Sequence, residues 1–254
     1  MHRRDFLAAT AAGIFFLPQP ASAVPLPDIP IDPTPNNPLP SNLGFEPVKA
    51  PKGKLYQLPK SKIKRIAWTV DDGVSSKSLR EYLDFIEKYE LRMTFFVTSG
   101  YSSWKKNKRQ LQELVDEGRV QLANHTHTHP SLTRLSSTAI QKELRRCGRF
   151  IEDNFGVEAK PYYRPPYGRI DARVIAAAKD IGYTRAVMWN GSLGDSVSQR
   201  RRYILRMGNK WIQNRTILID HVNDPTPKYV FSNLSKLLKK RDLETVTLDD
   251  VFLS

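Results

Sequence analysis

Short apolar runs alternate with longer amphipathic stretches from Lys62 to the end of the chain. The runs expected to be strands cover residues 65–70, 92–98, 120–123, 161–163, 183–189 and 216–220. The stretches expected to be helices cover residues 76–89, 105–117, 138–155, 172–180 and 229–240. Strands that alternate with helices in this way build a parallel sheet. The pattern therefore predicts an α/β domain whose sheet is either open or closed into a barrel.

The segment before this domain is rich in proline, which fixes one backbone dihedral and lacks the backbone N–H donor. Prolines stand at positions 25, 27, 30, 33, 35, 38, 40, 47, 51 and 59. Such a density excludes both a helix and a central strand. We therefore expect residues 24–60 to form a semi-rigid, proline-rich linker and residues 61–254 to form the folded domain.

The first residues have the layout of an export signal. Arg3 and Arg4 precede Phe6 and Leu7, a weakly apolar run follows, and residues 21–23 read Ala-Ser-Ala. These features describe a cleaved signal peptide, and the order Arg-Arg-x-Phe-Leu resembles the twin-arginine type. The apolar run is too short for a transmembrane anchor. We expect residues 1–23 to be removed and the protein to be exported, becoming periplasmic, associated with the cell wall, or secreted.

The balance of charge indicates an anionic partner. The chain carries a formal net charge of +14, and its single cysteine, Cys147, excludes an intrachain disulfide. Nucleic acid, a membrane surface or an acidic cell-wall polymer would each suit that charge, but the export signal argues against nucleic acid. Basic clusters at residues 105–109, 200–206 and 239–241 are either solvated helix faces or contacts with such a polymer. We expect a monomer that binds an anionic cell-wall glycan, with no nucleic acid and no transmembrane anchor.

Polar residues of complementary chemistry follow the ends of the expected strands. Because the carboxyl ends of parallel strands meet at one edge or face, where such folds bind their ligands, these residues should gather in one site. They are Asp71 and Asp72 after the first run, and then His125, Arg164, Asp195 and His221 after later runs.

Two of these clusters suggest a metal site. Asp71 and Asp72 are adjacent carboxylates that repel each other, and a bound cation would relieve that repulsion. His125 and His129 are four residues apart, so a helical turn would place both on one face, with His127 directed away from it. Two histidines and one carboxylate are a common catalytic zinc set. A polar surface loop and an exposed Asp-Gly turn are the structural alternatives.

The remaining candidates suggest acid–base chemistry beside that site. Arg164 begins the sequence Arg-Pro-Pro-Tyr-Gly, whose prolines would fix the direction of a guanidinium that can orient a neighbouring carboxylate. His221 closes an apolar run, and Asp195 could orient it and favour its protonated form. Taken alone, each of these residues could also be purely structural.

Together the motifs resemble those of the polysaccharide deacetylases (NodB-homology, carbohydrate esterase family 4). The resemblance covers about residues 62–254 and rests on residues 69–73, 125–130, 164–168, Asp195 and 219–221. It implies a distorted (β/α) barrel, and hydrolysis of N-acetyl groups on an N-acetylglucosamine-containing glycan such as peptidoglycan. It also implies one divalent metal ion, zinc first, with cobalt or nickel as alternatives.

The resemblance also implies a role for each matching residue. By position, the metal ligands would be Asp72, His125 and His129. The groups of the reaction would be Asp71 as general base, Arg164 as its partner, the backbone N–H of Tyr167 as oxyanion donor, His221 as general acid and Asp195 as the partner of His221. The sequence departs from the family at Val70, Ser196 and Ile219, where Phe, Trp and Leu are usual. Of these, only Ser196 affects the expected acetyl pocket.

Two other functions remain open at this stage. The motifs do not separate an amidase from an esterase that removes O-acetyl groups, for example from xylan. A glycan-binding module without turnover would keep the same groove and metal, although the intact set of acid, base and metal residues argues against it.

Overall fold

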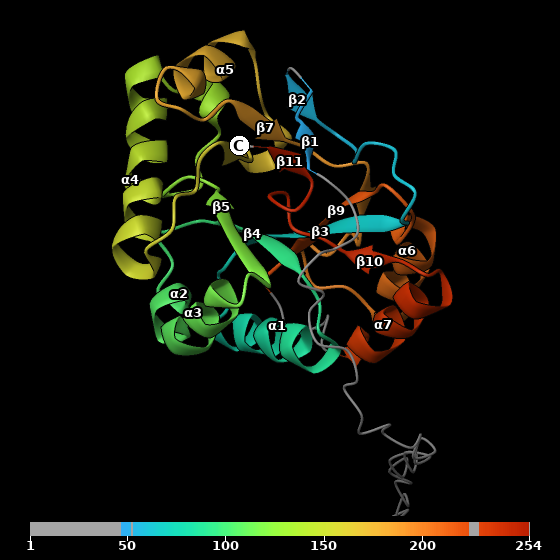
Figure 1. Ribbon diagram of the computed structural model, residues 1–254. Coiled ribbons are helices and arrows are strands. Elements are labelled where there is room, and N and C mark those ends of the chain that lie inside the picture. The colour runs from blue at the N-terminus through green and yellow to red at the C-terminus, as the bar shows by residue number, and fades with distance from the viewer. Residues whose placement is uncertain (1–46, 52, 224–228, 254) are drawn as a thin grey trace, which may run out of the picture. The chain divides into compact units, whose positions relative to one another are not determined.

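The computed structural model describes residues 47–51, 53–223 and 229–253 (Figure 1). Its main sheet has the order β2-β7-β6-β5-β4-β3-β9-β8, with β10 paired to β3, and all these pairings are parallel. The strands are β2 (Lys54–Leu55), β3 (Arg65–Asp72), β4 (Met93–Val97), β5 (Val120–Asn124), β6 (Tyr162–Tyr163), β7 (Arg185–Val187), β8 (Gly191–Ser192), β9 (Ile217–His221) and β10 (Glu244–Thr245). A second small sheet joins β1 (Val48–Lys49) and β11 (Phe252–Leu253).

The helices lie around the outside of this curled sheet (Figure 1). They are α1 (Ser76–Tyr89), α2 (Ser103–Lys106), α3 (Lys108–Asp116), α4 (Ser137–Phe155), α5 (Ala172–Lys179), α6 (Arg201–Trp211) and α7 (Phe231–Lys240), with 3₁₀ turns η1 (Leu132–Arg134) and η2 (Pro166–Gly168). The expected α/β fold, a distorted (β/α) barrel that does not close completely, is therefore confirmed. The helix expected at 105–117 is divided at Asn107, and α6 forms where the sequence indicated only a basic cluster.

Helix α1 shows how the sequence encodes these elements. Ser75 caps its N-terminus by accepting a hydrogen bond from the backbone N–H of Ser78 at 3.1 Å. Glu90 ends it in the left-handed conformation. Between these caps, apolar side chains recur at the spacing of one helix face and pack into the core; they include Leu79, Tyr82, Leu83 and Ile86.

Strand alternation decides which side chains of β3 face the inside of the curled sheet. Ile66, Trp68 and Val70 belong to the large core cluster shared with the helices, whereas Ala67 belongs to a smaller cluster with residues such as Phe96. Side chains two residues apart share a face of a strand. Asp71 therefore lies on the inner face with Ala67, although the whole strand is buried.

The end of the expected linker packs into the folded domain. Leu55 and Leu58 are buried in the inner core cluster. The backbone N–H of Met188 donates to Leu55 at 2.7 Å, and that of Leu58 donates to Arg215 at 3.0 Å, so this segment bridges β7 and the start of β9. Part of the segment that the sequence assigned to the linker is therefore packed against the domain, with Leu55 and Leu58 in its core. The expected signal at 1–23 and the linker up to residue 46 lie outside the described residues.

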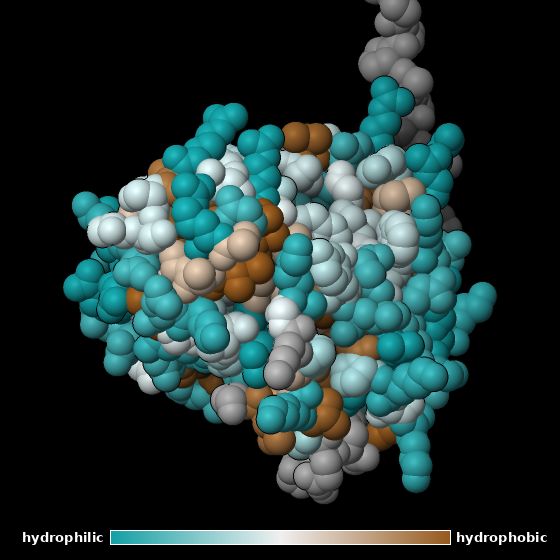
Figure 2. Space-filling view, turned by 90° about the horizontal axis from the view of Figure 1, so that it is seen from above, coloured by the Kyte–Doolittle hydropathy of each residue, from teal (hydrophilic) through white to brown (hydrophobic). Residues whose placement is uncertain are grey.

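The surface of the described domain is mainly hydrophilic in the view of Figure 2, with several patches of apolar residues between charged side chains. Exposed apolar or aromatic residues include Tyr167, Val197 and Tyr229. Within the described ranges, no helix is long and apolar enough to cross a membrane.

Candidate active site

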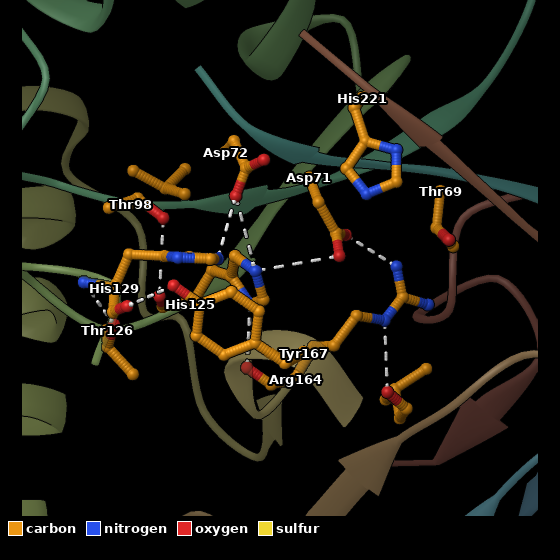
Figure 3. A network of polar contacts seen from close by, with 12 residues as sticks. Thr69, Asp71, Asp72, Thr98, His125, Thr126, His129, Arg164, Tyr167 and His221 are labelled. Atoms are coloured by element: carbon orange, nitrogen blue, oxygen red, sulfur yellow. Dashed lines mark hydrogen bonds and ion pairs between the residues drawn. The ribbon is translucent and has the colours of Figure 1, made fainter. Parts of the chain in front are cut away.

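The polar residues that follow the strands meet at one edge of the curled sheet (Figure 3). The register of the sheet brings them together, since Asp71 on β3 is paired with His221 on β9. Likewise, Asn124, the residue before His125, is paired with Tyr163, the residue before Arg164. Four separate segments of the chain therefore contribute to one cluster.

A buried ion pair stands at the centre of the cluster. Nη1 of Arg164 lies 2.6 Å from Oδ1 of Asp71, and both side chains are almost fully buried. The same guanidinium donates to the carbonyls of Val187 at 3.0 Å and Met188 at 3.1 Å, and it lies 4.1 Å from the ring centroid of Phe96. Burial lowers the pKa of Arg164, and Asp71 partly offsets this. The carboxylate is thus held in one orientation by a cation that is itself fixed.

Asp72, His125 and His129 form a group with the donors of a metal site. Their ligand atoms all lie within 4.8 Å of one another. Oδ1 of Asp72 is 3.1 Å from Nε2 of His129 and 3.5 Å from Nε2 of His125. Burial alone would raise the pKa of Asp72, but the two histidines outweigh it and lower that pKa. Two imidazole nitrogens and one carboxylate oxygen are the donor set of a catalytic divalent metal, so these residues fit the expected ion.

Outer contacts orient two of these three groups. Nδ1 of His125 lies 2.7 Å from the carbonyl oxygen of Arg164. A carbonyl can only accept, so Nδ1 carries a hydrogen, and in the neutral ring Nε2 would be the nitrogen available to a metal ion. The side-chain amide of Asn223 donates to Oδ2 of Asp72 at 2.7 Å, which leaves Oδ1 for the group.

The segment between the two histidines is not the helical turn that their spacing suggested. Residues 125–130 form an irregular loop, in which Thr126 has φ 73° and His129 has φ 59°. Left-handed residues reverse the chain locally, so both imidazoles reach Asp72 without a helix. The backbone N–H of His129 donates to the Thr126 hydroxyl at 3.1 Å, and this local bond replaces a helical one.

Glu143 on α4 holds this loop through hydrogen bonds, a role that no motif in the sequence indicated. Its carboxylate accepts from the backbone N–H groups of His127 at 3.0 Å and Thr128 at 2.7 Å. Nδ1 of His127 lies 2.9 Å from the hydroxyl of Ser99, so this histidine is directed away from the metal group, as expected. In the sequence, Glu143 is one more acidic residue on an amphipathic helix.

Backbone strain is concentrated at this cluster. Seven residues other than glycine have positive φ in the described part of the chain, and four of them are Asp72, Thr126, His129 and Tyr167. Such a conformation costs a non-glycine residue on the order of 1–3 kcal/mol and persists where the surroundings impose it. Tyr167, with φ 62°, is 64% exposed, and its ring packs against that of His129 at a centroid distance of 4.7 Å.

His221 and Asp195 form a second pair at the same edge. Nδ1 of His221 lies 3.0 Å from Oδ1 of Asp195, and the backbone N–H of His221 donates to Oδ2 at 2.9 Å. Burial raises the pKa of Asp195 to about 6. In Figure 3 the His221 ring lies beside Asp71, on the other side of that carboxylate from the metal group. Asp71 thus lies between the metal group and the His221–Asp195 pair.

The curled parallel sheet carries its polar cluster at the carboxyl ends of the strands, which is where α/β folds of this kind place their active sites. Residues 59–186 match the family model for polysaccharide deacetylases. The chain belongs to that family.

Relatives of this chain include proteins named as peptidoglycan deacetylases. It is 28% identical over 204 residues to an uncharacterized 30.6 kDa protein of Geobacillus stearothermophilus, covering 79% of this chain and 75% of that one. It is 28% identical to the peptidoglycan-N-acetylglucosamine deacetylase PgdA of Listeria monocytogenes, covering 78% and 41%. It is 30% identical to the peptidoglycan-N-acetylmuramic acid deacetylase PdaA of Bacillus subtilis, covering 57% and 53%. The chain thus spans about half or less of the two named enzymes.

Solved structures share the fold but differ in activity. A T48 deacetylase solved with substrate is 27% identical, with a TM-score of 0.66 and coverage of 74% of this chain and 90% of that one. A carbohydrate esterase family 4 pseudoenzyme from Bacillus anthracis has a TM-score of 0.68 at 22% identity, covering 80% and 72%. Since this fold also occurs in a pseudoenzyme, an argument for activity must come from the site residues.

Replacing Arg164 with methionine should lower the free energy of unfolding by about 3–5 kcal/mol, because it leaves the buried Asp71 carboxylate without its partner. Urea denaturation measures this. The matched control is Arg173→Met, which breaks a pair with Asp171 whose side chains are 46% and 44% exposed, and it should cost about 1 kcal/mol or less. Adding Asp71→Asn to the Arg164 variant should recover part of the loss. Equal losses of unfolding free energy for Arg164→Met and Arg173→Met would contradict this account of the pair.

Proposed function

We propose that this protein is an exported, metal-dependent deacetylase that hydrolyses N-acetyl groups of an N-acetylglucosamine-containing glycan such as peptidoglycan. The observation that carries the proposal is the position of Asp71, which lies between a complete set of candidate metal donors on one side and His221 on the other. The names of the Listeria and Bacillus relatives support the substrate class.

Asp72, His125 and His129 would hold one divalent ion, for which we propose zinc, with cobalt and nickel as alternatives. When bound, such an ion supplies Lewis-acid polarisation of the acetyl carbonyl and lowers the pKa of water. The outer contacts of His125 with Arg164 and of Asp72 with Asn223 would keep two of the three donors in place.

Asp71 is the proposed general base. Arg164 occupies its Oδ1, whereas its Oδ2 lies 3.6 Å from Nε2 of His125 and so faces the metal donors. Oδ2 can therefore accept the proton of the attacking water at the place where that water would be held. The pair with Arg164 holds the carboxylate in the orientation that a base needs before it reacts.

His221 is the proposed general acid. Its Nδ1 is engaged by Asp195, so the proton it gives to the departing nitrogen would come from Nε2. The ionised Asp195 would hold the ring in the orientation needed for that transfer. The backbone N–H of Tyr167, on the strained η2 turn, is the proposed donor to the developing oxyanion, a contact commonly worth about 3 kcal/mol.

The reaction is tested with the chain from Val24 to Ser254, stripped of metal and then assayed for acetate release with and without zinc. Acetate should appear only with metal, from N-acetylglucosamine oligomers and peptidoglycan. Asp71→Asn should lower kcat by about 10²–10⁴-fold while keeping the metal, because it removes the base and leaves the donors. Asp72→Asn should lose the metal. Asp116→Asn, on the exposed face of α3, is the control and should leave both kcat and the bound metal unchanged.

Other outcomes of this assay would overturn specific parts of the proposal. Acetate from acetylated xylan alone would make the protein an O-acetyl esterase. A tightly bound metal ion with no acetate from any acetylated glycan would make it a glycan-binding module. Full activity of Asp71→Asn would remove Asp71 from the reaction.

Helices α6 and α7 are the proposed contact with an anionic wall polymer. Neither helix contains Asp or Glu, and they pack against each other, with Arg201 donating to Asn233 at 3.0 Å. Exposed cations cover both helices, and Arg200 and α6 come shortly after Asp195 in the chain, so a polymer bound there could reach the site. The exposed cations on these helices are Arg201, Arg202, Arg206, Lys210, Lys236, Lys239 and Lys240.

Binding of the protein to purified wall sacculi should therefore weaken steeply with salt, because screening shortens from about 10 Å at 0.1 M to about 3 Å at 1 M. Replacing Lys236, Lys239 and Lys240 with glutamate reverses their charge. This should weaken binding at low salt and leave turnover of a short, uncharged oligomer unchanged. The control reverses the cluster at Lys105, Lys106 and Lys108, on α2 and α3, which should have little effect. Binding that does not depend on salt would rule out this contact.

Export is proposed from the layout of residues 1–23. Protein recovered from the cell envelope or the medium should begin at Val24, which N-terminal sequencing would show. Replacing Arg3 and Arg4 with lysine should retain the chain in the cytoplasm if the signal is of the twin-arginine type. Unprocessed protein that stays in the cytoplasm of the native host would refute export.

A further inference from the structure

A second carboxyl group, Asp220, lies directly behind Asp195. It precedes His221 on β9 and is paired in register with Val70, so its side chain points to the opposite face of the sheet from His221. That face is the large apolar core, and Asp220 is fully buried there. Burying a carboxyl group in such a place is energetically unfavourable unless it is protonated or is paired with a cation.

The hydrogen bonds of Asp220 bring the two carboxyl groups together. The indole N–H of Trp68 donates to its Oδ2 at 3.0 Å. The backbone N–H of His221 is shared between Oδ1 of Asp220 at 3.2 Å and Oδ2 of Asp195 at 2.9 Å. One N–H cannot neutralise two adjacent carboxylates, and within the described residues no lysine or arginine forms an ion pair with either.

The surroundings favour a proton on Asp220 rather than on Asp195. Burial raises the pKa of Asp220 well above its ordinary value, and the charge of Asp195 raises it further, whereas Tyr82 of α1 and Trp68 of β3 lower it only in part. Asp195 also has a raised pKa, about 6, with a smaller contribution from Asp71. Asp195 can therefore ionise while Asp220 stays protonated.

We propose that Asp220 is a neutral carboxylic acid that donates its proton to Oδ2 of Asp195, which leaves Oδ1 of Asp195 as the acceptor for Nδ1–H of His221. Asp220 is then a positioning residue that acts on His221 through Asp195. The consequence for catalysis rests on the proposed function of His221 as general acid. The protonation state proposed for Asp220 is independent of that function.

Three variants separate this role from a purely structural one. Asp220→Asn keeps a neutral donor of the same shape, Asp220→Leu removes the donor, and Trp68→Phe removes only the indole contact with Asp220. The measurements are the infrared carbonyl band of a protonated carboxyl group at pH 7, the NMR signal of Nδ1–H of His221, and the pH profile of kcat.

The wild-type protein and Trp68→Phe should show the protonated carboxyl band, and Asp220→Asn should lack it. In Asp220→Leu the acidic limb of the pH profile should move up by about one unit, because the ionised Asp195 has lost a hydrogen-bond donor. Asp220→Asn should restore the wild-type limb. Trp68→Phe should lower thermal stability without moving the limb.

Absence of the protonated band at pH 7, or the same displaced limb in Asp220→Asn and Asp220→Leu, would overturn the proposal. If Asp220→Leu does not fold, the infrared band of the wild-type protein and of Asp220→Asn still decides the protonation state. Since neither spectrum depends on turnover, a protein inactive on every glycan would refute the proposed function while leaving this test intact.

Discussion

The site depends on one buried guanidinium. Arg164 donates through its side chain to Asp71 and to the carbonyls of Val187 and Met188, while its own carbonyl accepts from His125. A buried cation must find acceptors for its N–H groups, and these are supplied by β3 and by the end of β7. Satisfying Arg164 therefore fixes the ends of these strands relative to one another. The same residue orients both the proposed base and one proposed metal ligand.

The rest of the cluster is held from outside by contacts that make up for a poor local geometry. Asp72, Thr126, His129 and Tyr167 all have unfavourable backbone angles, yet they stand on the ends of strands that are buried throughout or nearly so. Hydrogen bonds from more distant elements reach this edge, notably that of Asn223 with Asp72 and those of Glu143 with the loop between the histidines. A rigid sheet that carries strained loops can hold in place groups that must not relax when a substrate binds.

Membership of the family and the chemistry of the site are separate arguments. The fold is shared with enzymes named as deacetylases and with a pseudoenzyme, so architecture alone carries no activity. What argues for turnover in this chain is that the proposed base, the proposed acid and the candidate metal donors all lie together at one edge of the sheet. The cationic helices α6 and α7 carry a separate proposal, the binding of an anionic polymer, which does not depend on the reaction.

The sequence by itself determined the alternation of strands and helices and the identity of the polar residues at the strand ends, because both are written in local periodicity and residue type. Helix α1 has the bounds that its pattern predicted. The spacing of His125 and His129 would suit a helical turn, but both residues lie in a loop whose backbone N–H groups donate to Glu143 on α4, a contact that the spacing does not reveal. The burial of Leu55 and Leu58 and the contact of Asp220 with Asp195 were likewise decided only by the tertiary structure. Which strands are neighbours, and which face of each strand is inside, follow from long-range pairing that no local pattern contains.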